Sequence, residues 1–189
     1  MTIQHKSIPD SDLHEPKGVA SATVDKTYIS DGLGSGSWQV LPGRAHADMY
    51  IDAGATTQTL SAAQAYAKLN PGTEWTSGVS NILTVSPSTG EITLTEAGNY
   101  LITFWTTFTT TALAAGTGYK FKFALNGATS TRTLEAHKPT NGADVVTCSA
   151  TGIVTATAGQ KLTMYCAGDA TSSGANITVT EAGLTAVRL

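Results

Sequence analysis

From about residue 47 to the C-terminus, the chain is a series of short runs in which apolar and polar residues alternate between turn-forming residues. Successive side chains of a β-strand point to opposite faces, so a period of two predicts a strand with one buried face. Many such runs without long helical patterns predict a sandwich or barrel. The predicted strands are 48–51, 65–69, 82–85, 91–94, 99–110, 118–126, 130–135, 144–155, 161–167 and 175–189.

The composition favours the same class. Of 189 residues, 32 are threonine and 19 are glycine, while only 13% are charged, about half of the usual ~25%. Threonine suits the half-buried surface of a sheet. Residues 61–69 have helix propensity, but the run is too short for an independent helix and its periodicity is ambiguous. We therefore expect one all-β domain with a polar, weakly charged exterior.

Charge and hydropathy exclude several partners. The net charge is −3 and the 11 basic residues are scattered, whereas nucleic-acid binding needs clustered lysine and arginine. No apolar run reaches the ~18 residues of a membrane-spanning helix, and the first residues lack the apolar part of a secretory signal. Without such a signal, free buried thiols are favoured for Cys148 and Cys166, although a disulfide stays open.

Residues 1–45 differ from the rest because proline, glycine, serine and aspartate interrupt every apolar run. Two strand-like pieces, 27–30 and 38–41, lie between these breakers. Isolated apolar residues of this kind cannot form a core, but they can dock onto another surface. We predict an extended N-terminal arm over 1–45 and a folded domain over 46–189.

One strand bears on assembly. Residues 119–126 alternate apolar residues with lysine, as expected of a strand with one face in water. Residues 100–108 instead carry apolar side chains on both faces, so a second subunit or the arm should cover the face turned away from the core. An ordinary core with one exposed tryptophan is the alternative. The predicted interface residues are Tyr100, Phe104, Trp105 and Phe108, and the pattern does not decide which of them face a symmetry axis.

Three segments of the domain resemble the jelly-roll superfamily of tumour necrosis factor and the complement C1q head. They are Gly90–Phe104 with its Gly98-Asn-Tyr100 motif, Ser149–Tyr165 with a turn at Ala158-Gly-Gln160, and residues 175–189. The resemblance covers residues 47–189. It implies an antiparallel ten-strand jelly roll, a strand at 65–69, and a homotrimer with aromatic residues of the inner sheet against the three-fold axis. The family's receptor-binding loops and calcium ligands have no clear equivalent here.

The arm resembles the N-terminal segments of tailed-bacteriophage virion proteins. The matching residues are His14-Glu-Pro16-Lys-Gly18, then Tyr28-Ile29-Ser-Asp-Gly32, then Gly34-Ser-Gly-Ser-Trp38. The resemblance implies a segment that attaches a jelly-roll head to a capsid or fibre. The residues expected to dock on the capsid are His14, Pro16, Tyr28, Ile29 and Trp38.

The sequence lacks a pattern for catalysis. The histidines His5, His14, His46 and His137 are far apart and none has metal-ligand spacing. The glycines of residues 32–36 lack the helix and lysine of a phosphate-binding loop and the context of a nucleophile elbow. The acidic residues lie mostly at turns, without a marked cleft. We expect a protein that is not an enzyme and binds no cofactor or metal.

These observations predict a bacteriophage capsid decoration, or cement, protein. A homotrimer would dock on the lattice of the major capsid protein through its arms, on the capsid surface, after synthesis in the host cytoplasm. The alternative is a head-fibre or tail-fibre tip that binds a host surface glycan, and the jelly roll alone does not decide between them because it serves many functions.

Overall fold

The computed structural model describes residues 26–33, 36–41, 44–60, 63–69, 74–110, 114–142, 144–172 and 175–189. The chain divides into two compact units, Met1–Arg44 and Ala45–Leu189. Each unit is described by itself.

Unit Ala45–Leu189 is built from two antiparallel sheets. The main path of the six-stranded sheet runs in the order β13 (Val145–Ala156), β9 (Gly98–Thr110), β15 (Asn176–Arg188), β3 (His46–Asp52) and β6 (Thr76–Asn81), and β4 (Thr57–Thr59) pairs with β15. The main path of the seven-stranded sheet runs β11 (Ala128–Thr129), β10 (Gly118–Leu125), β14 (Gln160–Gly168), β8 (Glu91–Leu94) and β7 (Thr84–Ser86). In the same sheet β12 (Leu134–His137) pairs with β10, and β5 (Ala67–Lys68) pairs with β14.

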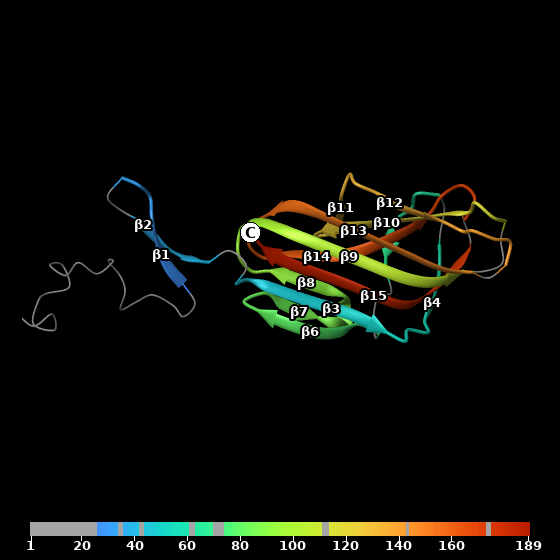
Figure 1. The fold of residues 1–189 in the computed structure, drawn as a ribbon, viewed down its shortest axis with the longest axis horizontal. Coiled ribbons are helices and arrows are strands. Elements are labelled where there is room, and N and C mark those ends of the chain that lie inside the picture. The colour runs from blue at the N-terminus through green and yellow to red at the C-terminus, as the bar shows by residue number, and fades with distance from the viewer. Residues whose placement is uncertain are drawn as a thin grey trace, which may run out of the picture. The chain divides into compact units, whose positions relative to one another are not determined.

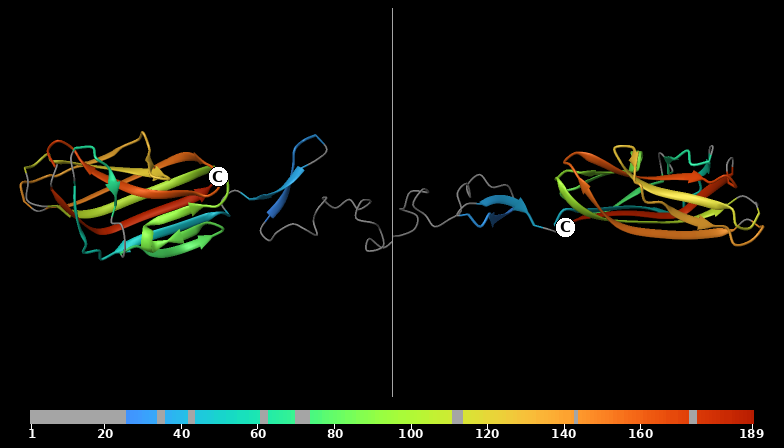
Figure 2. Two further views of the ribbon diagram at one scale, coloured as in Figure 1. Left: turned by 180° about the vertical axis from the view of Figure 1, so that it is seen from behind. Right: turned by 90° about the horizontal axis from the view of Figure 1, so that it is seen from above.

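The chain crosses repeatedly between the two sheets. From β8 it passes to β9, back to β10, over to β13, back to β14 and finally to β15, which Figures 1 and 2 show as two layers of long strands. Each main path has five strands, and the long strands from β8 onward alternate between the two layers, as in a jelly roll. The predicted all-β antiparallel jelly-roll sandwich is therefore confirmed.

The core lies between the sheets, and β9 shows how it is filled. On this strand the even-numbered side chains from Tyr100 to Thr110 are buried and the odd-numbered ones are half-buried. The Phe108 ring packs against the rings of Tyr119 and Phe121 of β10, with centroids 5.2 Å apart in both pairs. The aromatic residues of β9 and β10 thus join the two sheets, because side chains of facing sheets interdigitate in a sandwich.

The strand predictions succeed where one face is buried and fail where it is not. Residues 91–94, 99–110 and 144–155 match β8, β9 and β13 to within one residue. The strand β6 was missed because it lies at a sheet edge and is mostly exposed, so its sequence does not alternate. The strand expected at 130–135 is β12, which begins only at Leu134.

The segment with helix propensity contains a strand instead. In residues 63–69 only Ala67 and Lys68 form a ladder, with Cys166 and Tyr165 of β14. The implied strand at 65–69 is thus present in shortened form. No helix in the described residues is long and apolar enough to cross a bilayer.

Part of the N-terminal segment pairs with itself. Strands β1 (Lys26–Ser30) and β2 (Gly36–Val40) form an antiparallel hairpin in unit Met1–Arg44. The sequence predicted strand-like pieces at 27–30 and 38–41, and β1 and β2 contain most of these residues. In the connection between the strands Gly32 has φ 76°, a left-handed conformation that glycine adopts without strain.

Candidate interface site

The outward side of the six-stranded sheet is a broad surface with few charges, which we call the threonine face. The strands β13, β9 and β15 lie side by side along it (Figure 1). It consists of Thr147, Ser149, Thr151 and Ile153 of β13, Leu101, Thr103, Trp105, Thr107 and Thr109 of β9, and Glu181, Gly183, Thr185 and Val187 of β15. Because hydroxyl groups can satisfy one another, such a surface is easier to remove from water than a charged one.

Hydrogen bonds between neighbouring strands use part of these hydroxyls. The Oγ1 atoms of Thr103 and Thr151 are 3.1 Å apart, and those of Thr107 and Thr147 are 3.0 Å apart. Cross-strand threonine pairs of this kind stabilise a sheet and hold their side chains in fixed rotamers. The face is therefore ordered before any partner covers it.

Trp105 lies near the centre of the threonine face. Its neighbours across the ladder are Ser149 on β13 and Gly183 on β15, and Gly183 in turn pairs with Tyr50 of β3. A Cβ atom at Gly183 would overlap the Trp105 indole, 2.6 Å from its Cε2. The indole thus lies across β15 where glycine leaves room, beside Tyr50, which is 38% exposed.

Apolar and acidic groups are separated on this side of the sheet. Ile153 is 56% exposed at the β13 edge and forms a row with Leu101 and Val187. The carboxylates on this side belong to Asp48, Asp52 and Glu181, on β3 and β15 and not on β13. Asp48 pairs with Thr185, and Glu181 pairs with Asp52 on one side and with Thr107 of β9 on the other. The part formed by β13 and β9 carries no charged side chain outward in the described structure, so it is the part best suited to contact another protein.

The four predicted interface residues do not share a face. Tyr100 and Phe108 have no solvent exposure and Phe104 is 4% exposed, because all three point into the space between the sheets. A side chain enclosed by its own subunit has no surface to offer a second one. Trp105 alone of the four is on the outward side, so the expectation that all four share an exposed face is corrected, and an interface role for Trp105 stays a prediction.

The hairpin brings together two of the predicted docking residues. Tyr28 and Trp38 are direct cross-strand partners, and their rings meet edge to face with centroids 5.5 Å apart. Ile29 points to the other side and is 37% exposed. The sequence did not predict the pairing, because it depends on the register of two strands separated by breakers. His14 and Pro16 lie outside the described residues.

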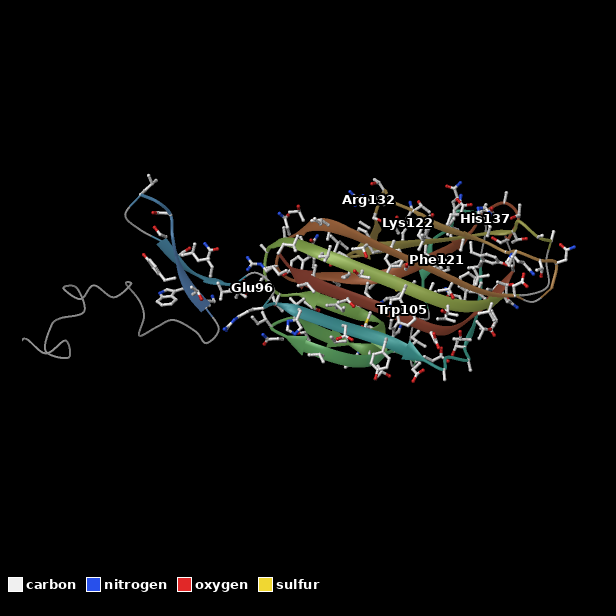
Figure 3. The ribbon with its side chains drawn as sticks, in the orientation of Figure 1. Glu96, Trp105, Phe121, Lys122, Arg132 and His137 are labelled. Carbon is white, nitrogen blue, oxygen red and sulfur yellow. The ribbon has the colours of Figure 1, made fainter. Side chains whose placement is uncertain are left out.

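The outward side of the seven-stranded sheet carries lysine side chains, unlike the threonine face. Trp105 and Lys122, both labelled in Figure 3, belong to opposite sheets. The Lys122 ammonium lies 4.6 Å from the centroid of the Tyr66 ring. The carboxylate of Glu91 bridges two lysines, with Oε1 2.8 Å from Lys68 Nζ and Oε2 2.9 Å from Lys161 Nζ. Lysine thus concentrates on the side of the domain away from the threonine face.

This lysine bridge makes stability depend on pH. Burial by itself would raise the pKa of Glu91, but hydrogen bonds from Lys68 and Lys161 outweigh it and lower the pKa from 4.5 to about 2. The stabilisation is complete above the unfolded pKa and is lost as the pH falls from about 4.5 towards 2. The shift corresponds to at most about 3 kcal/mol, and screening around the half-exposed Lys161 lowers this to about 2 kcal/mol.

We therefore expect Glu91→Gln to remove a contribution to the free energy of unfolding that the parent protein loses in acid. Urea denaturation at about pH 6 should show the variant less stable than the parent. The gap should narrow as the pH falls below about 4.5 and should close only at about pH 2 or below. Glu96→Gln, which removes a carboxylate that forms no ion pair with a described lysine, serves as the control for the loss of one negative charge. A gap that widens towards low pH would contradict the role given to Glu91.

The described residues contain no group of three or more His, Cys, Asp and Glu side chains that could hold a metal ion. His46 is on β3, and His137 on β12 lies 3.5 Å from a Glu135 oxygen; His5 and His14 are outside the described structure. Cys148 and Cys166 are both free. Burial raises the pKa of each thiol to about 12, so the expected free thiols are confirmed and neither is an activated nucleophile.

Both cysteines should resist alkylation in the folded protein. Thiolate is the reactive form, and raising the pKa from 9 to about 12 lowers its population about a thousandfold at neutral pH. Labelling with iodoacetamide followed by mass spectrometry should show two modified thiols in urea and slow or no modification without it. Rapid native labelling of Cys148 would show that its strand opens.

Comparison with known proteins gave matches among solved structures and none among sequences. No protein-family model and no curated protein sequence match the chain. The solved structures that resemble it include the Eiger TNF of S. frugiperda, at 11% identity and a TM-score of 0.48 over 77% of this chain and 94% of that one. The globular domain of zebrafish complement 1qA has 13% identity and a TM-score of 0.47 over 77% and 97%, and murine APRIL at pH 8.0 has 14% and 0.44 over 76% and 99%.

Proposed function

We propose that this chain is a structural protein of a bacteriophage virion, a homotrimeric capsid decoration protein. Its jelly roll trimerises through the threonine face, and its N-terminal arm docks on the lattice of the major capsid protein. The observation that carries the proposal is the division of the chain into an arm with its own aromatic hairpin and a separate β-sandwich. The arm's likeness to phage virion segments points to the same partner.

The threonine face supports the trimer. It offers Trp105, Leu101 and Ile153 within a sheet in which four threonine hydroxyls are already paired. The nearest carboxylates lie on β15 and β3, and among the described residues the outward sides of β9 and β13 carry none. Aromatic residues at the centre of a patch with few charges are typical of protein interfaces. Two neighbouring subunits that cover this face would bury the outward apolar side chains of β9, which do not point into the sandwich core.

The hairpin supports the docking role. A two-stranded hairpin is at best marginally stable in water, and here it presents an aromatic pair and the exposed Ile29. Docking would order it against a partner that covers these side chains. Three arms on one trimer also act together: once the first has bound, the effective concentration of the others is high. The trimer would thereby clamp neighbouring capsomers.

Removal of residues 1–44 tests the proposal directly. The truncated protein should stay folded and trimeric but should no longer cosediment with expanded capsids that lack the decoration protein. Trp38→Ala should weaken binding at least about tenfold in the full chain, because truncating an aromatic anchor costs about 2 kcal/mol or more. Lys122→Gln, on the sandwich, should bind like the parent. Unchanged capsid binding by the truncated trimer would refute arm docking.

A fibre-tip protein that binds a host surface glycan is the second candidate. The Lys122 and Tyr66 pair favours it, since aromatic rings and cations together suit sugars. Copy number separates the candidates. Quantitative mass spectrometry of virions should find hundreds of copies for a decoration protein and a handful for a fibre.

A further inference from the structure

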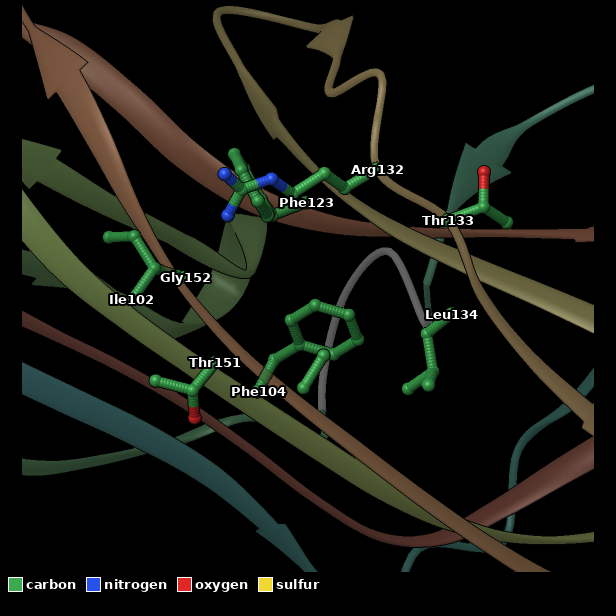
Figure 4. Close-up of a pocket in the computed structure, with 9 residues that line it drawn as sticks. Ile102, Phe104, Phe123, Arg132, Thr133, Leu134, Thr151 and Gly152 are labelled. Atoms are coloured by element: carbon green, nitrogen blue, oxygen red, sulfur yellow. The ribbon is translucent and has the colours of Figure 1, made fainter.

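A cavity of about 80 Å³ opens between the edges of the two sheets. Its lining comes from β9, β10, the segment before β12, β12 itself and β13 (Figure 4). Apolar side chains form most of the wall: Ile102, Phe104, Phe123, Leu134 and Ala150. The strands β12 and β13 belong to different sheets, so the cavity reaches the core from the open side of the sandwich.

Among the described residues, the one cationic side chain that lines this cavity is Arg132. Arg132 is exposed, and its guanidinium makes no ion pair or hydrogen bond with any residue that the structure describes. A Cβ atom at Gly152 would come within 2.9 Å of its Nη1 atom. The side chain therefore lies against β13 at the one lining position of that strand that has no side chain, and no carboxylate lines the cavity.

We propose that this cavity binds a short branched aliphatic carboxylate, whose alkyl group fills the space between the sheets while its carboxylate pairs with Arg132. An apolar wall with one polar group at its mouth is the usual arrangement of a small-ligand site. Guanidinium is the side chain best matched to a carboxylate, because its N–H groups donate to both oxygens at once. None of the lining residues belongs to unit Met1–Arg44, and Thr151 is the one lining residue that also belongs to the threonine face.

The cavity volume limits the ligand. A cavity of about 150 Å³ accommodates benzene, and this one is about half as large. An alkyl group of about three or four carbons fits such a space, so an isobutyl group attached to a carboxylate is the expected size. A longer fatty acid has no room between the sheets.

Titration of the full-length protein with 3-methylbutanoate tests the site, with the neutral 3-methylbutanamide as the matched probe. Ligand-observed NMR and calorimetry should show the acid binding in the millimolar range and the amide about tenfold more weakly, since only the acid gains the charge-assisted pair with Arg132. Arg132→Gln should abolish this preference. Equal binding of acid and amide to the parent, or no binding of either, would overturn the proposal.

Three further variants locate the binding. Ala150→Leu fills the cavity and should abolish binding of both probes, whereas retained binding would place the ligand elsewhere. Gly152→Ala displaces only the mobile end of Arg132, so it should weaken the acid and leave the amide unchanged. Lys122→Gln removes a cation that does not line the cavity and should leave the acid unaffected; a loss there equal to that of Arg132→Gln would indicate nonspecific attraction and refute the site.

Discussion

Replacing Trp105 with glutamate should convert the proposed trimer into folded monomers. The proposed interface would then contain a carboxylate from every subunit close to the three-fold axis. Burying an unpaired charge costs several kcal/mol per ion even after relaxation, and mutual repulsion adds to it. The sandwich itself should persist, because Trp105 lies on the outward side of β9 and the core side chains of that strand are unchanged.

Multi-angle light scattering measures this result. The parent should have about three times the 19.5 kDa mass of the chain and the variant about 19.5 kDa. Lys122→Glu introduces the same charge on the opposite sheet and should remain trimeric. A parent that is already monomeric would refute the trimer, and a variant that stays trimeric would show that the contacts lie on another surface.

Replacing Phe108 with alanine should have the reverse effect, a loss of stability without a specific loss of assembly. Phe108 is fully buried between the sheets, in contact with Tyr119 and Phe121. Truncating such a side chain removes its burial and leaves a cavity, which together cost about 3–5 kcal/mol. This is a large part of the 5–15 kcal/mol that stabilises an ordinary domain.

The measurement is best made in the monomeric Trp105→Glu background, because the stability of an oligomer depends on its concentration. Urea denaturation of the double variant should show the full loss relative to Trp105→Glu alone. Phe108→Leu keeps most of the volume and should cost only about 1 kcal/mol. If Phe108→Ala instead separates subunits at unchanged monomer stability, the residue belongs to the interface, as the sequence alone suggested.

Trp105 and Phe108 show what a sequence pattern can predict and what it cannot. Period-two alternation and turn residues predicted most strands of the sandwich, because strand formation depends strongly on local conformation. The composition and the lack of a secretory signal predicted that both cysteines are free thiols. Alternation also separates the side chains of β9 into two sets. When both sets contain aromatic residues, however, the pattern is symmetric and does not say which set is inside.

The tertiary structure decided that question. The facing strand β10 presents Tyr119 and Phe121 to Phe108, which commits the even-numbered residues of β9 to the core and leaves Trp105 outside, over Gly183. Strand register likewise pairs Tyr28 with Trp38 and brings Arg132 to Gly152. The sequence by itself therefore determined that this chain forms sheets with two kinds of face. Which face is covered by the protein itself, and which residues meet across strands distant in sequence, follows only from long-range packing.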